Sequence, residues 1–325
     1  MANKSHVTEF ILLGFPGLPQ KFDVPISLAL FLSYLISLFS NTAVLTLIIF
    51  KKQLHQPMYI IIANLALSDI LFDTATLPKI IAKYWFGAAS VSFAGCVIQL
   101  FCVHYLGSFD SCIIMVMAID RYVAICNPLR YSSIITNKRT VLLCGFFWLL
   151  TSIVASVIAG LDSSLYYCDG NQIKSCFCTN MTLIALSCSD ITFVKRFVFG
   201  LAMIVLLLPL CFIIFSYMII IKVIHSRTES ERWKKAFYTC STHLFVIGLY
   251  FIPRLFVYIS NQVNLILNGD VNVLLLCVYS FVPHMANPII YCLGTKEIRR
   301  ILRKLVKKKF IKKFELKPTI NVISN

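Results

Sequence analysis

The sequence predicts an all-α membrane protein: a seven-transmembrane helix bundle with a short cytoplasmic amphipathic eighth helix. Of the 325 residues, 58% are hydrophobic and only 14% are charged, whereas soluble domains are roughly 45–50% apolar and 25% charged. A water-soluble core of this size cannot bury so many apolar side chains. The apolar residues also fall into long runs. Together these observations exclude a cytosolic enzyme, a coiled coil, a small disulfide-rich domain and a disordered chain.

Seven runs are long enough to cross a bilayer, which takes roughly 20 apolar residues in a helix. The predicted spans are 24–50, 58–84, 91–119, 141–161, 197–221, 236–260 and 271–295. Each must satisfy its own backbone hydrogen bonds, because lipid offers none, and this favours helices. Proline interrupts the last three spans at Pro209, Pro253 and Pro288, where it removes a backbone hydrogen bond and permits a kink.

The distribution of Lys and Arg predicts the orientation. They gather in the connections 51–52, 130–139 and 222–235 and in the tail 296–325, which has eleven Lys and Arg against two Glu. These segments are therefore predicted to be cytoplasmic, with residues 1–23 extracellular, 24–295 forming the membrane domain, and the chain residing in the plasma membrane. The tail supplies most of the net charge of +16, so we expect contact with anionic lipid and no nucleic-acid partner.

Two sequons, at Asn3 and Asn180, fall on the predicted outer side and are candidate glycosylation sites. Residues 1–20 lack a basic start followed by an apolar run, so no cleavable signal peptide is expected. The first span is then expected to serve as the insertion signal.

Most of the thirteen cysteines lie in the spans, where a cysteine is usually a small apolar side chain, but four differ. Cys96 begins the third span, and Cys168, Cys178 and Cys188 are spaced ten apart in the long outer connection. Because the exterior is oxidising, we expect Cys96–Cys178 and Cys168–Cys188 bridges. Free thiols are the alternative, and Cys176 competes with Cys178 for Cys96.

Ionisable side chains within a membrane are costly and indicate function. Asp69 and Asp110 lie mid-span in the second and third spans, and two carboxylates at similar depth repel unless one is protonated or a cation lies between them. Oxygen ligands suit a small hard cation, so we predict a bound sodium ion as the metal and no other cofactor. The alternative is a protonated pair with water.

Other polar side chains lie nearer the two ends of the spans. His104 is nearer the outside and is predicted to contact a ligand in an outward-opening pocket, the alternative being a packing role. Asp120 and Arg121 end the third span, where the arginine either reaches the headgroups or is latched by the aspartate. Tyr217 and His243 are at matching depth, so the three helices could bring them together with Arg121 in a switch.

Several motifs share one resemblance. Residues 117–131 read MAIDRYVAICNPLRY, 57–59 read PMY, 235–244 read KAFYTCSTHL and 287–291 read NPIIY. These resemble the signatures of vertebrate odorant receptors, within the rhodopsin-like G-protein-coupled receptors. The N-terminal FILLGFPGL of residues 10–18 is similar to the fish-like, class I branch. The resemblance covers almost the whole chain.

The resemblance implies functional residues by position. The activation and G-protein-coupling residues would be Asp120, Arg121, Tyr122, Tyr217, His243, Asn287 and Tyr291. The odorant pocket would be lined by Val103, His104, Gly107, Ser108, Met181, Leu201, Ala202, Val205, Phe251, Leu255 and Tyr258. The sodium site and both outer bridges also match. Three departures from the family pattern stand out. Asp110 is shorter than the family's usual Glu, and Gln262 replaces an Arg that binds short carboxylic acids in class I receptors. Arg254 is unusual for the family and could face the pocket, a neighbouring helix or water.

The function implied is that of an odorant receptor and not of an enzyme. A small odorant would shift the receptor toward an active arrangement and activate a stimulatory G protein that raises cAMP, in the sensory cilia of olfactory neurons. Residues 296–313, with Ile298, Ile301, Leu302 and Leu305 at helical spacing, would form the eighth helix on the membrane. The alternatives are a chemosensory receptor outside olfaction and an ion- or proton-conducting transporter that uses the buried carboxylates and His104.

Overall fold

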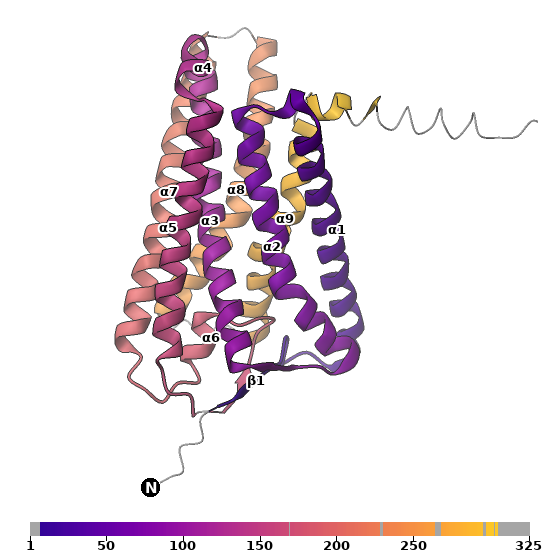
Figure 1. Ribbon diagram of the computed structural model, residues 1–325, viewed down its shortest axis with the longest axis vertical. Coiled ribbons are helices and arrows are strands. Elements are labelled where there is room, and N and C mark those ends of the chain that lie inside the picture. The colour runs from indigo at the N-terminus through magenta and orange to yellow at the C-terminus, as the bar shows by residue number, and fades with distance from the viewer. Residues whose placement is uncertain are drawn as a thin grey trace, which may run out of the picture.

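The computed structural model (Figure 1) describes residues 7–168, 170–227, 230–263, 268–294, 297–301 and 303–304. Within these residues, seven long helices run side by side in a bundle. They are α1 (Asp23–Phe50), α2 (Pro57–Phe86), α3 (Phe93–Cys126), α5 (Asn137–Ser163), α7 (Thr192–Arg227), α8 (Ser230–Gln262) and α9 (Gly269–Gly294). Each covers one predicted span, which confirms the seven-helix fold.

The helices are longer than the apolar runs that predicted them. α3 continues to Cys126 and α7 to Arg227, because a helix can extend past the hydrocarbon layer while its backbone groups stay satisfied. In the described part of the chain, six helices are long and apolar enough to cross a membrane. The seventh is α8, in which the side chains of residues 230–243 lie outside the described part. The protein is therefore a multi-pass membrane protein.

The bundle is organised around α3, which packs against α2, α5 and α7. Its inward side chains, such as Leu100, Phe109 and Ile113, are fully buried. The outward surface is apolar as well, and Phe39, Leu149 and Phe215 are exposed large hydrophobic side chains. An apolar exterior around a packed interior fits a protein whose surroundings are lipid.

A small three-stranded sheet covers one end of the bundle, which we call the sheet end. The order is β2 (Ser90–Ser92), β1 (Glu9–Leu12) and β3 (Gln172–Ile173), with β1 antiparallel to β2 and parallel to β3. Phe10 and Leu12 of β1 are fully buried. The sequence analysis did not predict this sheet, which adds to the helical fold without changing it. Strands of two to four residues are too short to show a periodic pattern.

The opposite end, which we call the α4 end, carries the short helix α4 (Tyr131–Ile134) and three-residue turns at Lys52–Leu54 and Pro128–Arg130 (Figure 1). Local signals fix several helix boundaries. Pro57 opens α2, and Gly87 ends it with a φ of 69°, a conformation that favours glycine. The Ser92 and Thr136 side chains cap α3 and α5 by accepting hydrogen bonds from the Gly95 and Arg139 backbone N–H groups.

The chain after α9 turns across the α4 end, beside α1 (Figure 1). Residues 297–301 are helical, and Ile298 and Ile301 are buried in a cluster with Tyr59, Ile62 and other side chains. Tyr59 Oη also donates a hydrogen bond to Glu297 Oε2 at 3.3 Å. The first turn of the predicted eighth helix is therefore held against the bundle, while Leu302, Leu305 and the rest of 305–325 lie outside the described residues.

Candidate functional site

The bundle holds a cavity of about 630 Å³ at the sheet end, between α3, α7, α8 and α9. The connection from α5 to α7, which includes the short helix α6 (Asn180–Ile184), forms its roof. A volume of this size is typical of sites for small ligands. Of the eleven residues predicted for the odorant pocket, nine line this cavity: Val103, His104, Gly107, Ser108, Met181, Leu201, Ala202, Val205 and Tyr258.

Phe251 and Leu255 of α8 do not line the cavity. Phe251 is fully buried in a cluster that also contains Ile114 and Tyr250, and Leu255 packs against that cluster. Their neighbour Arg254 lines the cavity instead, together with Val257. The sequence analysis left the direction of Arg254 open, so the structure adds a cation to the cavity and directs Phe251 and Leu255 elsewhere.

Two disulfides hold the roof of the cavity. Cys96 of α3 is bonded to Cys178, and Cys168 to Cys188, as predicted. Gln99 Oε1 accepts a hydrogen bond from the Cys178 backbone N–H at 2.8 Å, one turn along α3 from the first bridge. Cys176, the competing cysteine, has a free thiol whose Sγ lies 3.7 Å from Cys277 Sγ. That contact and burial raise the pKa of the Cys176 thiol well above its usual value.

The placement of Asn180 contradicts the prediction that it carries a glycan. Its side chain is buried, and Nδ2, the atom to which a glycan would attach, donates a hydrogen bond to Asp162 Oδ1 at 2.7 Å. A bulky glycan requires a surface position. The sequon is instead part of a capping box, in which Thr179 and Thr182 cap α6. The other sequon, at Asn3, lies outside the described residues.

Arg254 of α8 is buried against α3 and α9. Its Nη1 donates hydrogen bonds to Gly107 O at 3.2 Å and to Tyr250 Oη. Its Cζ lies 4.9 Å from the Tyr250 ring centroid and 5.3 Å from that of Tyr279, so two electron-rich rings flank the guanidinium. A Cβ at Gly107 would meet Arg254 Nη2. Glycine at this position lets the guanidinium lie directly against α3.

His104 of α3 also faces the cavity. It lines the wall one turn from Gly107, and its buried Nε2 has no hydrogen-bond partner among the described residues. Ser280 Oγ on α9 is likewise buried on the cavity wall without a partner there. Buried polar atoms are almost always hydrogen-bonded in folded proteins. These atoms are therefore available to a polar group of a ligand.

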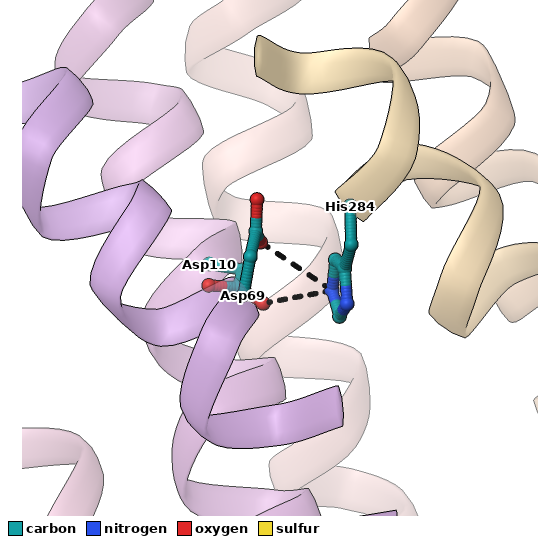
Figure 2. A group of neighbouring side chains, drawn as sticks. All are labelled: Asp69, Asp110 and His284. Carbon is teal, nitrogen blue, oxygen red and sulfur yellow. Dashed lines mark ion pairs between the residues drawn. The ribbon is translucent and has the colours of Figure 1, made fainter. Parts of the chain in front are cut away.

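A second polar cluster lies in the centre of the bundle (Figure 2). His284 of α9 points toward Asp69 of α2 and Asp110 of α3, and its Nε2 lies 3.5 Å from Asp69 Oδ1 and 3.6 Å from Asp110 Oδ2. Nδ1 lies 2.8 Å from Asp73 Oδ1. All four side chains are buried. Their polar atoms link three helices through one imidazole ring that can carry a positive charge.

This arrangement does not fit the predicted sodium ion. Hard cations such as calcium are held by several oxygen ligands at roughly 2.3–2.6 Å. Here the third member of the group is an imidazole, whose nitrogen lies 3.5 Å from Asp69 Oδ1 and 3.6 Å from Asp110 Oδ2, so the group offers a nitrogen where a hard cation prefers oxygen. The sequence analysis missed His284 because the last span was treated as uncharged. An ionisable side chain within a span was the signal that could have found it.

Amide side chains add further hydrogen bonds in and near this cluster. Asn287 Nδ2 donates a hydrogen bond to Asp69 Oδ2 at 3.1 Å. Asn41 of α1 donates from Nδ2 to His284 O at 3.0 Å. Closer to the α4 end, Trp148 of α5 donates from Nε1 to Asn64 Oδ1 at 2.8 Å. Asn41 therefore joins α1 to the cluster, and Asn287 gives α9 a second contact with Asp69.

Apart from Asn287, the predicted activation residues whose side chains are described lie closer to the α4 end than this cluster does. Asp120 is buried, and its Oδ1 accepts a hydrogen bond from Tyr131 Oη at 2.7 Å. Burial and this carboxylate raise the pKa of Tyr131. Tyr217 of α7 is buried in the cluster that contains Ala118 and Ile220, whereas Arg121 and Tyr122 are half-buried. The side chains of His243 and Tyr291 lie outside the described residues, so their part in a switch stays a prediction.

Seven long helices surround a roofed cavity, and an Asp-Arg-Tyr sequence lies at the far end of the third. This combination is typical of a G-protein-coupled receptor. Comparison with known proteins narrows this class. The sequence profile described as "Olfactory receptor" matches residues 30–309. The chain therefore belongs to the olfactory receptor family, whose members are not enzymes.

Individual relatives agree with this assignment. The chain is 36% identical to Olfactory receptor 56A4 of Homo sapiens over 302 residues, 93% of this chain and 96% of the relative. It is 35% identical to Olfactory receptor 56B34 of Mus musculus over 308 residues, 94% of each chain. It is also 33% identical to Olfactory receptor 2AT4 of Homo sapiens over 297 residues, 91% of this chain and 92% of the relative. The similarity thus extends over nearly the full length of each.

Proposed function

We propose that this receptor detects a small organic odorant in the cavity at the sheet end and activates a stimulatory G protein that raises cAMP. The cavity of about 630 Å³ carries the proposal, because its wall combines apolar side chains with unpartnered polar atoms. The ligand shifts the equilibrium only by the difference between its affinities for the active and the resting arrangement. The N-terminal motif additionally supports membership of the class I branch.

The proposed orientation places the sheet end outside the cell and the α4 end in the cytoplasm. Support comes from the exposed Lys51, Lys52, Arg130, Lys138 and Arg139, which all belong to connections at the α4 end. Both disulfides lie at the sheet end and need an oxidising compartment. In the plasma membrane of olfactory cilia, the cavity would then face the odorant and Arg121 the G protein.

We expect Arg121→Ala to abolish the agonist-dependent cAMP response. Arg121 would move from its half-buried position toward Tyr217 and His243 and open a cleft for the G protein, and alanine cannot make those contacts. The measurement is a cAMP reporter in cells, normalised to surface receptor by flow cytometry of an N-terminal tag. Arg196→Ala is the control, because Arg196 is exposed on α7 away from the cavity wall. A full response by surface-expressed Arg121→Ala would contradict the coupling role.

We expect His104→Ala to reduce agonist potency about three- to tenfold. The unpartnered Nε2 of His104 would exchange a hydrogen bond with the bound ligand, and one such bond contributes roughly 0.5–1.5 kcal/mol. Dose–response curves of the cAMP reporter measure the change. His55→Ala is the matched control, since His55 is exposed at the α4 end. Unchanged potency for every agonist would place the ligand elsewhere.

A further inference from the structure

We infer that the cavity selects ligands that carry a carboxylate, and that Arg254 binds it. This rests on the proposed function, since it names the chemical class of ligand for the same cavity. Arg254 is 8% exposed, lies on the cavity wall and is always charged. Leaving a buried charge without a counter-charge is costly. A ligand with a negative charge would remove that cost on binding.

The cavity wall supplies no counter-charge of its own. Arg254 and Lys174 both line it, and no Asp or Glu is among its described lining residues. Among the described residues, no carboxylate lies within ion-pair distance of the guanidinium. Asp110, one turn beyond Gly107 on α3, acts on the guanidinium only at longer range, and its Oδ2 lies 3.6 Å from His284 Nε2. Both charged side chains on the described cavity wall are therefore positive, which disfavours amines.

The guanidinium is held rigidly with part of its donor set free. Nη1 donates to Gly107 O and Tyr250 Oη, and the rings of Tyr250 and Tyr279 fix its plane. The hydrogen bonds from the guanidinium to described residues both start from Nη1, so Nη2 and Nε are the donors that we assign to a ligand. A guanidinium binds a carboxylate through two parallel hydrogen bonds, and a pre-ordered fork loses little entropy in doing so.

The rest of the wall indicates what the carboxylate is attached to. Val103, Leu201, Val205, Val257 and Leu276 are apolar and line the same cavity. They match a hydrocarbon skeleton whose burial supplies affinity, while Arg254 supplies orientation and selectivity. The ligand class is therefore a singly charged organic acid with an apolar body. Gln262, at the end of α8, is not part of the cavity wall, so the acid would be held deeper in the bundle.

The test compares matched ligands on wild-type and variant receptors. The probes are hexanoate, octanoate, decanoate and phenylacetate, each with the methyl ester, primary amide and amine of the same skeleton. The variants are Arg254→Gln, Arg254→Lys and Gly107→Ala, with Arg196→Gln as the matched control. Responses are cAMP dose–response curves normalised to surface receptor. For the wild type, at least one acid is expected to be at least tenfold more potent than the ester, amide or amine of the same skeleton.

Arg254→Gln is expected to reduce the potency of that acid by about 30-fold or more, which corresponds to about 2 kcal/mol. Arg254→Lys keeps the charge without the fork and should fall between wild type and Arg254→Gln. Gly107→Ala should also reduce the acid response, because its Cβ would displace Nη2. These two variants keep the test decisive if Arg254→Gln does not reach the surface. Arg196→Gln should behave as wild type.

Two results would overturn the inference and leave the proposed function standing: activation by esters, amides or amines but not by acids, or an acid response that none of the three variants changes. A receptor that reaches the surface and responds to no compound in an extended panel of neutral, acidic and basic odorants would instead contradict the proposed function itself. The two failures are therefore distinguishable.

Discussion

His284→Leu will remove most of the receptor from the cell surface. The variant leaves Asp69, Asp73 and Asp110 buried together without the one basic side chain that lies among them in the described part of the bundle. Removing one partner of a buried ion pair typically costs about 3–5 kcal/mol. Because folding stability is only about 5–15 kcal/mol in total, a loss of this size reduces surface abundance strongly.

The measurement is surface receptor by flow cytometry, supported by the melting temperature of detergent-purified protein. His55→Leu is the matched control, since His55 is exposed and should tolerate the change. The double variant His284→Leu with Asp73→Asn should recover part of the loss, because Asp73 Oδ1 makes the shortest contact with the ring, at 2.8 Å. Normal surface abundance of His284→Leu would contradict the charge-pairing role of this histidine.

The melting temperature in different salts tests the same carboxylate–histidine cluster in a second way. If His284 provides the positive charge between Asp69 and Asp110, the melting temperature of the wild-type protein should be the same in sodium chloride and in choline chloride at equal ionic strength. Marked stabilisation by sodium over choline would mean that an ion enters between the carboxylates after all. That outcome would return the site to the arrangement that the sequence alone suggested.

The comparison of sequence and structure shows which physical signals are local. A span needs only a long apolar run, so the spans were predictable from the chain alone. Cysteines on one side of the membrane indicated the two bridges, but the choice between Cys176 and Cys178 needed the structure. Nine of the eleven residues predicted for the pocket through resemblance to the family also line the cavity. The β1 strand was not found, because four residues that pair with segments about 80 and 160 positions away leave no local pattern.

The roles of the residues that the sequence misassigned or left open depend on contacts between segments that are distant in the chain. A histidine in an apolar run looks neutral until Asp69, Asp73 and Asp110 from two other helices are placed around it. The direction of Arg254 depends on Gly107 leaving room on α3. The Asn180 sequon looks like a surface site until α6 turns its amide toward Asp162. In each case the sequence identifies a reactive group, whereas its role is decided by tertiary partners.

Cys178→Ser will also lower the amount of receptor at the cell surface, and it will do so more than Cys168→Ser. The Cys96–Cys178 bridge spans 82 positions and the Cys168–Cys188 bridge spans 20. In the chain-entropy model, closing loops of these lengths contributes about 4–5 and about 3 kcal/mol. The first bridge also fixes the roof of the cavity to α3 beside Gln99, which accepts a hydrogen bond from the Cys178 backbone. Its loss should therefore bring surface receptor close to background.

Surface receptor and the melting temperature measure both variants, and two free cysteines serve as controls. Cys211→Ser should have no effect, because Cys211 is exposed on the outer face of α7. Cys176→Ser removes only a thiol contact with Cys277 and should cost much less than Cys178→Ser. If Cys176→Ser were instead the more damaging change, Cys96 would pair with Cys176. The roof would then be shifted by two residues, and the cavity wall built from Thr179 to Thr182 would need to be rebuilt around that pairing.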